Sequence, residues 1–203
     1  MSGLLGHRGL LLGGVAPPPV TYTTLNPSDK AASVSLSGGN LIATATSNPS
    51  GVARSVQVLS GKRYFEAVLT STGGAVGAVY AAGVCNSAQS LTGSMGYATA
   101  NGWAGWGPSG GWRHNGVPGT GTLTNADVLG FAIDTATNSL WVRDNGVWAT
   151  GDPVAGTGAM WTNLTGTLYA AACPWSLDTI VTMRFDPATF RDAAPSGFSP
   201  ITA

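Results

Sequence analysis

Charged residues are scarce in this chain. Asp, Glu, Lys and Arg make up 9% of its 203 residues, and the formal net charge is zero. Nucleic-acid binding needs basic residues gathered into a stripe or patch, whereas the nine basic residues here are scattered, so we expect no nucleic-acid partner. Disorder normally comes with high charge and few aromatic residues. A chain with little charge and seven tryptophans is therefore predicted to be ordered.

Residues that carry out chemistry are also few. Cys85 and Cys173 are too few and too far apart for a disulfide framework or a zinc site, and we interpret them as buried thiols in adjacent strands. A glycosidase needs two paired carboxylates, but Glu66 is the single glutamate. His7 and His114 lack the G-x-S-x-G motif that would support a Ser-His-Asp triad. We therefore expect a non-enzymatic protein without metal or cofactor.

No apolar run is long enough to cross a membrane. Residues 1–19 are apolar and end in Pro17-Pro18-Pro19, but His7 and Arg8 interrupt a run that would need ~20 residues to span a bilayer. A signal peptide would place its positive charge before the apolar stretch. We interpret residues 1–19 as an anchoring arm with a proline linker, and a frayed terminus is the alternative. The leucines expected to dock on a partner are Leu4, Leu5, Leu10, Leu11 and Leu12.

The pattern that is present is that of β-strands. Leu129, Phe131 and Ile133 alternate with smaller or polar residues, residues 135–138 form a turn, and Leu140 and Val142 repeat the alternation, which predicts a β-hairpin. Further strands are predicted at Val20–Leu25, Ser33–Leu36, Leu41–Thr46, Arg63–Thr70, Val76–Val84 and Ile180–Phe185. No stretch has a convincing amphipathic helical pattern. Residues 20–203 are thus predicted to form one all-β domain.

Several motifs, in order along residues 22–200, resemble those of the SPRY domain. They are "D-V-hydrophobic-G-hydrophobic-A-hydrophobic-D" at 127–134 followed by "L-W-hydrophobic" and "N-G-V", "G-K-x-Y-F-E-hydrophobic" near 61–67, "V-G-hydrophobic-A" near 76–79, "L-Y-P-A" near 168–171, a last core strand at 181–185, and "F-x-x-x-P-x-G-F" near 190–198. Two features depart from the family. Ala170 stands where it often has proline, and residues 96–121 do not align with it.

The resemblance implies a fold and a kind of function. The fold would be a two-sheet antiparallel β-sandwich, a concanavalin-like jelly roll, with the extended N-terminal arm in front of it. SPRY domains are known for binding proteins, so recognition by loops at one end of the sandwich is implied. Residues 190–198 would fold back over an open end. Fold alone does not identify the partner.

Residues 96–121 combine many glycines with three tryptophans. Tryptophan offers a flat face to a sugar ring or an aromatic side chain, and glycine lets a ligand approach the backbone. The alternative is that these tryptophans belong to the core, but Trp103 and Trp106 fall on opposite faces of a strand, so at most one is expected there. The candidate ligand-binding residues are Tyr97, Trp103, Trp106, Trp112, Arg113, His114 and Asn115.

Composition and arm together suggest a setting. Short Gly-, Ala- and Thr-rich β-domains behind an apolar arm resemble bacteriophage virion components, either head decoration or fibre proteins or tail-associated ones. Under this hypothesis the chain is part of the virion and binds other virion proteins through the arm. Its domain binds a host-surface glycan or protein. A homo-oligomer is expected because virion components are commonly symmetric. The alternative is a soluble adaptor or lectin-like module that binds a peptide or sugar.

Two sets of substitutions distinguish core residues from ligand-binding residues. Trp141→Ala and Phe131→Ala are expected to unfold the domain, at ~3–5 kcal/mol each. Alanine at Trp103, Trp106 or Trp112 is expected to spare the melting temperature and weaken ligand binding. A hydrolase, the third possibility, would require an activity that Glu66→Gln removes.

Overall fold

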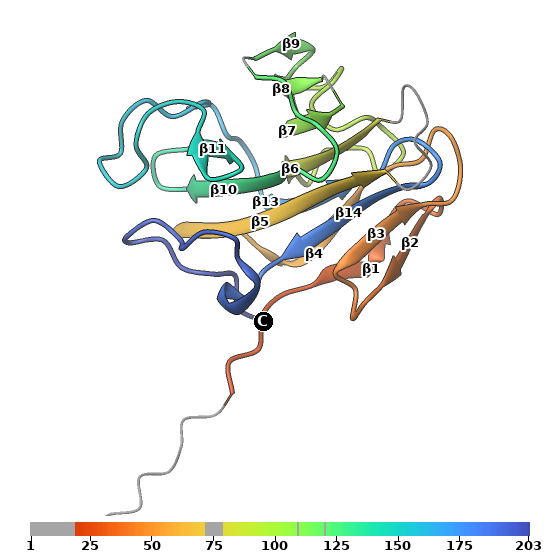
Figure 1. Cartoon of the computed structure of the whole chain (residues 1–203), viewed down its shortest axis with the longest axis horizontal. Helices are drawn as coiled ribbons and strands as arrows, with labels where there is room; N and C mark the ends of the chain where they lie inside the picture. Colours follow the sequence, from red (N-terminus) through yellow and green to blue (C-terminus); the bar gives the residue numbers. More distant parts are fainter. Residues whose placement is uncertain (1–18, 72–78, 109, 120) are drawn as a thin grey trace, which may run out of the picture.

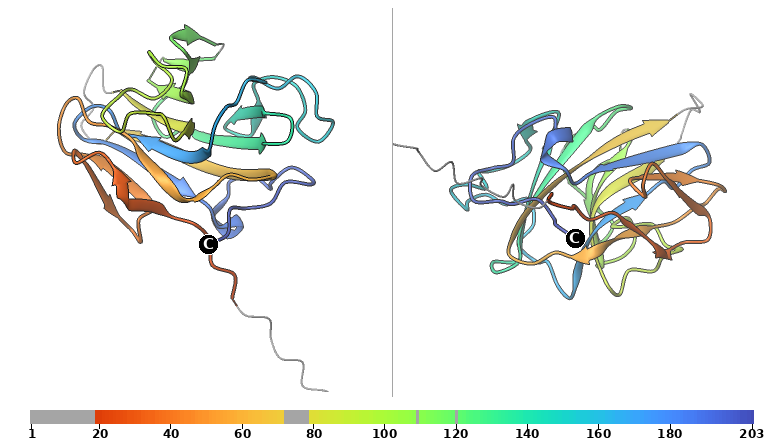
Figure 2. Two further views of the ribbon diagram at one scale, coloured as in Figure 1. Left: turned by 180° about the vertical axis from the view of Figure 1, so that it is seen from behind. Right: turned by 90° about the horizontal axis from the view of Figure 1, so that it is seen from below.

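The computed structural model describes residues 19–71, 79–108, 110–119 and 121–203. These residues form two seven-stranded antiparallel sheets packed face to face, joined by loops and one short 3-10 helix, η1 (Pro187–Thr189). Figures 1 and 2 show the two layers from three sides. The predicted two-sheet antiparallel sandwich is confirmed. The anchoring leucines, Leu4, Leu5, Leu10, Leu11 and Leu12, lie outside the described residues.

Sheet I has the strand order β1-β4-β13-β6-β7-β8-β9. Its strands are β1 (Leu25–Lys30), β4 (Ala53–Val58), β6 (Tyr80–Asn86), β7 (Gly102–Gly107), β8 (Gly111–His114), β9 (Val117–Pro118) and β13 (Leu168–Cys173). Cys85 in β6 and Cys173 in β13 are buried free thiols on neighbouring strands, as predicted.

Sheet II has the strand order β12-β11-β10-β5-β14-β3-β2. Its strands are β2 (Val34–Ser37), β3 (Ile42–Ala45), β5 (Lys62–Ser71), β10 (Val128–Asp134), β11 (Ser139–Asp144), β12 (Val147–Trp148) and β14 (Thr179–Arg184). The predicted hairpin is the pair β10–β11, in which Phe131 lies opposite Val142 and Asp134 opposite Ser139.

The main core fills the space between the sheets. Every second residue of a strand points inward, so Phe65, Phe131 and Phe185 from sheet II meet Trp103 and Trp112 from sheet I. Phe65 stacks on Phe131 with ring centroids 4.9 Å apart. Burial of large aromatic rings on both inner faces supplies much of the driving force that holds the layers together.

Both sheets are also covered on part of their outer faces. On sheet I, Trp106 packs with Met95, Ala104 and both cysteines. On sheet II, Phe198 packs on Trp141 and Tyr64. The C-terminal segment therefore covers a face of the sheet, and the prediction that it folds over an open end is wrong. The reason is that Tyr64 and Trp141 present large rings on the outer face, which the segment shields from water.

Two predicted strand boundaries are wrong. Val20–Leu25 is not a strand, because β1 begins only at Leu25 and Tyr22 forms an isolated bridge to Thr202. The Thr23 amide also donates to the Ile201 carbonyl (2.9 Å), so the first and last described segments lie side by side. The strand predicted at Val76–Val84 is β6, which starts at Tyr80 and runs to Asn86; residues 76–78 lie outside the described residues.

Within the described part of the chain, no helix has the length and hydropathy needed to span a membrane.

Candidate ligand-binding surface

The candidate region folds as the hairpin of β7 and β8. Trp103 pairs with His114 and Gly105 with Trp112 across the hairpin, at one edge of sheet I. Because side chains alternate along a strand, Trp103 and Trp112 point inward and Trp106 points outward. The prediction that Trp103 and Trp106 lie on opposite faces is confirmed. The prediction that at most one of them is in a core is wrong, since the outer face of sheet I is covered there as well.

Trp103 is fully buried, so its ring offers no face to a ligand. Its indole N–H donates to Asn163 Oδ1 (3.0 Å), and His114 stacks on the indole with centroids 4.8 Å apart and planes 7° apart. The expectation of an accessible Trp103 is therefore corrected. It is a core residue whose polar atom is satisfied inside the protein.

Trp112 is a core residue too. It is 1% exposed and contacts Phe131 edge to face, with centroids 6.1 Å apart. Gly105, opposite it, makes this possible, because a Cβ there would come within 2.8 Å of the Trp112 ring. Gly105 thus leaves space for a tryptophan ring of the protein itself rather than for a ligand.

Trp106 forms the floor of a hollow on the outer face of sheet I. Its indole N–H donates to the Met95 carbonyl (2.7 Å), and its edges meet Tyr97 and Trp175 at centroid distances of 5.7 and 6.4 Å. The hollow has a volume of about 340 Å³. We call it the aromatic hollow, and its lining residues are Val79, Ser94, Tyr97, Trp106 and Trp175.

Tyr97 and Arg113 give this hollow an accessible rim. Tyr97 is 51% exposed, and the Arg113 guanidinium lies 4.8 Å from the centroid of its ring. Arg113 also donates through Nε to the Gly110 carbonyl (2.9 Å), which fixes its position. The rim can therefore contact an apolar side chain through the rings and an acceptor oxygen through the guanidinium.

Trp175 was missed in the sequence. It follows β13 in a loop, and sequence reasoning considered tryptophans only between residues 96 and 121. The signal available was a tryptophan next to a proline at the end of a strand, where a large ring in a loop needs either a covering element or a partner.

His114 and Asn115 line a second hollow of about 400 Å³, together with Met160, Trp161 and Asn163. His114 Nδ1 lies 2.9 Å from the Gly102 carbonyl oxygen and Nε2 lies 3.1 Å from Asn163 Nδ2. A carbonyl only accepts, so Nδ1 donates and Nε2 accepts from the Asn163 amide, which is the neutral tautomer. His114 thus has its polar atoms occupied within the protein, whereas Asn115 is exposed.

Glu66 is held by its neighbours. It is 1% exposed, pairs with Arg143 (3.4 Å) and Arg184 (3.5 Å), and accepts from the Tyr64 hydroxyl (2.7 Å) and the Arg191 amide (2.7 Å). Burial, followed by the hydrogen bond to Glu66, raises the pKa of Tyr64, which keeps it a donor. This network gives Glu66 a structural role.

No metal-binding cluster is found in the described ranges: no three His, Cys, Asp or Glu residues come close enough together there.

Comparison with known proteins identifies the fold only. No family model matches the chain, and no curated protein matches it. Among solved structures, the SPRY domain of human HERC1 has a TM-score of 0.59 and 16% identity over 79% of this chain and 96% of that domain. The TRIM65 PSpry domain has a TM-score of 0.54 and 15% identity over 81% and 93%. Stonustoxin has a TM-score of 0.56 and 20% identity, covering 80% of this chain but 27% of the toxin chain. The expected SPRY-like sandwich is therefore confirmed.

Proposed function

We propose that this SPRY-like sandwich is a non-enzymatic module that binds another protein through the aromatic hollow. The observation that carries the proposal is the half-exposed Tyr97 ring, with Arg113 on it, beside an apolar hollow on the outer face of sheet I. SPRY-like domains are typically protein–protein interaction modules. A volume of about 340 Å³ is at the small end of ligand pockets, which suits one or two anchor side chains of a partner.

The chemistry of the hollow suggests what the anchor is. Three of its five lining residues are aromatic, so it favours an apolar or aromatic side chain. The Arg113 guanidinium on its rim favours a carbonyl or carboxylate next to that side chain. We therefore expect a short peptide segment with an apolar anchor and an acidic or backbone acceptor beside it.

A selection from a random peptide library, followed by titration of the selected peptide, tests the proposal. Tyr97→Ala and Trp175→Ala are expected to weaken binding at least ~10-fold each, because each removes a wall of the hollow. Val154→Ala, which truncates another exposed apolar side chain in a distant loop, is the matched control and is expected to bind like wild type. Unchanged affinity in both hollow variants would reject this site.

The non-enzymatic part of the proposal is supported by the state of the carboxylates. Glu66 is enclosed by two arginines and backbone amides, so it cannot reach a substrate. Asp134 accepts from the Ala136 amide (2.9 Å) within its own turn, as turn aspartates commonly do. A hydrolytic activity that is lost in Glu66→Gln while the fold persists would contradict this part.

The wider setting remains the virion hypothesis from composition. It proposes a bacteriophage particle component attached through Leu4, Leu5, Leu10, Leu11 and Leu12, homo-oligomeric, with a host glycan or protein as its ligand. The alternative is a soluble adaptor or lectin-like module. Sedimentation of a source lysate with mass-spectrometric detection distinguishes them, because a virion protein migrates with large particles. Deletion of residues 1–16 is then expected to abolish assembly without affecting the fold, whereas an adaptor would keep its ligand binding.

A further inference from the structure

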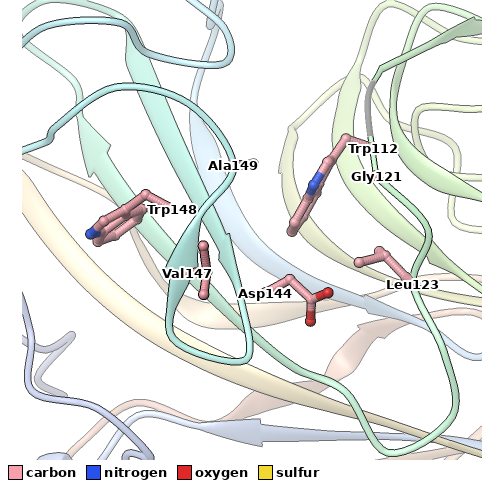
Figure 3. Close-up of a pocket in the computed structure, with 7 residues that line it drawn as sticks. All are labelled: Trp112, Gly121, Leu123, Asp144, Val147, Trp148 and Ala149. Atoms are coloured by element: carbon pink, nitrogen blue, oxygen red, sulfur yellow. The ribbon is translucent and has the colours of Figure 1, made fainter.

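A third hollow opens at the edge where both sheets end. β8 is the next-to-last strand of sheet I and β11 the next-to-last strand of sheet II, and the hollow lies between them with a volume of about 330 Å³. We call it the edge hollow. Figure 3 shows its lining residues, Trp112, Gly121, Leu123, Asp144, Val147, Trp148 and Ala149. Val147 on its rim is 72% exposed, so the hollow is open to a partner.

Asp144 stands where a core residue is expected. Leu140 and Val142 of β11 point into the core, and the next residue in the same alternation is Asp144, which lies opposite the buried Leu129. Figure 3 shows its carboxylate between Leu123 and Val147, facing the hollow. Asp144 Oδ1 is buried and has no hydrogen-bond partner. Buried polar atoms are nearly always bonded, so this oxygen calls for an explanation.

The surroundings of Asp144 disfavour its negative charge. Burial, and then the carboxylate of Asp127, raise the pKa of Asp144 to about 6, and the attraction of Arg191 opposes them only in part. Asp127 itself is well bonded, since it accepts from the Thr124 hydroxyl (2.9 Å) and the Asn145 amide (2.7 Å). A cation in the hollow would therefore be attracted by both carboxylates, and the ion pairs of the described residues do not include Asp144.

We propose that the edge hollow binds a lysine side chain of a protein partner. The ammonium donates to the Asp144 carboxylate where it lines the hollow, and the methylene stem packs against Val147 and Ala149 beside the buried Trp112 and Leu123. Arginine fits less well, because its guanidinium binds a carboxylate best through both oxygens, whereas Oδ1 of Asp144 is buried. The charge is recognised by Asp144 rather than by Trp148, whose ring already has the Arg143 guanidinium 5.0 Å from its centroid.

The proposal needs a protein partner, as the proposed function does, but it does not need the aromatic hollow. The two can therefore fail separately. A peptide selected on the full chain reports on Tyr97 and Trp175, whereas a lysine compound reports on Asp144.

The test is an NMR titration of the full chain with Nα-acetyl-lysine N-methylamide at pH 8, following the indole N–H signal of Trp112 and the methyl signals of Val147. Saturable shifts of these signals are expected. The norleucine counterpart has the stem without the charge, and it is expected to bind at least ~10-fold more weakly. At pH 5 the lysine compound, charged throughout, is expected to bind about tenfold more weakly, because Asp144 is then mostly protonated.

Asp144→Asn is expected to abolish the shifts, and Asp152→Asn is the matched control. Asp152 lies in an exposed turn where its Oδ1 accepts from the Val154 amide (2.8 Å), a bond that asparagine can keep. Asp144→Asn is expected to melt no lower than wild type, because the carboxylate has no partner to lose. A lower melting temperature in this variant, equal binding of the norleucine compound, tighter binding of the arginine counterpart, or unshifted Trp112 and Val147 signals would each overturn the proposal.

Discussion

Glu66 shows how one side chain ties together three parts of the chain. It lies in β5, its arginine partners lie in β11 and β14, and the amides of Arg191 and Asp192 belong to the C-terminal segment. All of these groups donate, so the site requires a carboxylate that only accepts. The glutamate of the strand motif at 61–67 is thus a structural residue.

Glu66→Gln is expected to lower the free energy of unfolding by about 3–5 kcal/mol, because removing the carboxylate leaves the buried Arg143 and the partly exposed Arg184 without a counter-charge. The amide N–H₂ would also face donors. Urea denaturation measures the change, with Asp152→Asn as the control for loss of one carboxylate. A loss below ~1 kcal/mol would mean that Arg143 and Arg184 are satisfied without Glu66.

Asp144 makes the stability of the domain depend on pH in the opposite sense from most carboxylates. Its pKa is about 6 in the folded protein against 3.8 as the ordinary value, so the folded state holds the proton more tightly. Stability from this group is highest below about pH 4 and falls as the pH rises through 6.

The comparison of wild type with Asp144→Asn isolates this effect. Because asparagine does not titrate, we expect the difference in stability to depend on pH, with the variant gaining on wild type between pH 4 and 7 and no further change above. Urea denaturation at several pH values measures it. A difference that is independent of pH would show that Asp144 has an ordinary pKa.

In the β7–β8 hairpin, the structure changes the interpretation of two tryptophans. Trp103 and Trp112 lie in the same core as Phe131, and the structure reverses the expectation that their truncation spares stability. Trp103→Ala and Trp112→Ala are now expected to lower the free energy of unfolding by ~3–5 kcal/mol, as Phe131→Ala does. Thermal and urea denaturation measure this, and Tyr97→Ala is the control from the exposed side of the same region. Melting temperatures equal to that of wild type within error would show that neither ring stabilises the core.

The sequence predicted the strands of this hairpin better than their surroundings. Alternation correctly separates Trp103 from Trp106, and the β10–β11 hairpin and the SPRY-like sandwich follow from local patterns. Alternation does not reveal whether an outer face is covered. Met95 and Trp175 lie in loops and cover Trp106. The aromatic hollow therefore depends on the positions of these loops, which strand patterns do not predict. The alternation of Leu140 and Val142 extends to Asp144, but its place opposite the buried Leu129 depends on the strand register, which local patterns do not give.

Gly83 tests how closely β6 and β7 pack. A Cβ at this position would lie 2.1 Å from the Trp103 carbonyl oxygen and 2.8 Å from the Ala104 Cα. Because these are backbone atoms, Gly83→Ala is expected to force the strands apart and cost at least ~2 kcal/mol. Gly93→Ala is the control, since its nearest atoms would be 3.4 Å away. Urea denaturation of the two variants should differ clearly, and equal stability would show that β7 moves without cost.

The whole molecule protects its two thiols. Burial raises the pKa of both Cys85 and Cys173 to about 12, so neither forms a thiolate in the folded state at pH 8. We expect an aromatic disulfide reagent to label no thiol in the native protein and two in urea, at a rate set by global unfolding because both cysteines lie in sheet I. Rapid labelling of one thiol without urea would reveal a local opening of β6 or β13.

The bridge between Tyr22 and Thr202 holds the first and last segments of the domain side by side. The Ala203 amide donates to the Thr21 carbonyl (2.9 Å), so the two ends leave the sandwich at one point, and Figure 1 shows β8 and β9 at the opposite side from it. A short linker can therefore join the ends, new ends can be opened in another surface loop, and the domain can be inserted into a loop of a host protein. In each arrangement the β8–β9 edge faces away from the junction.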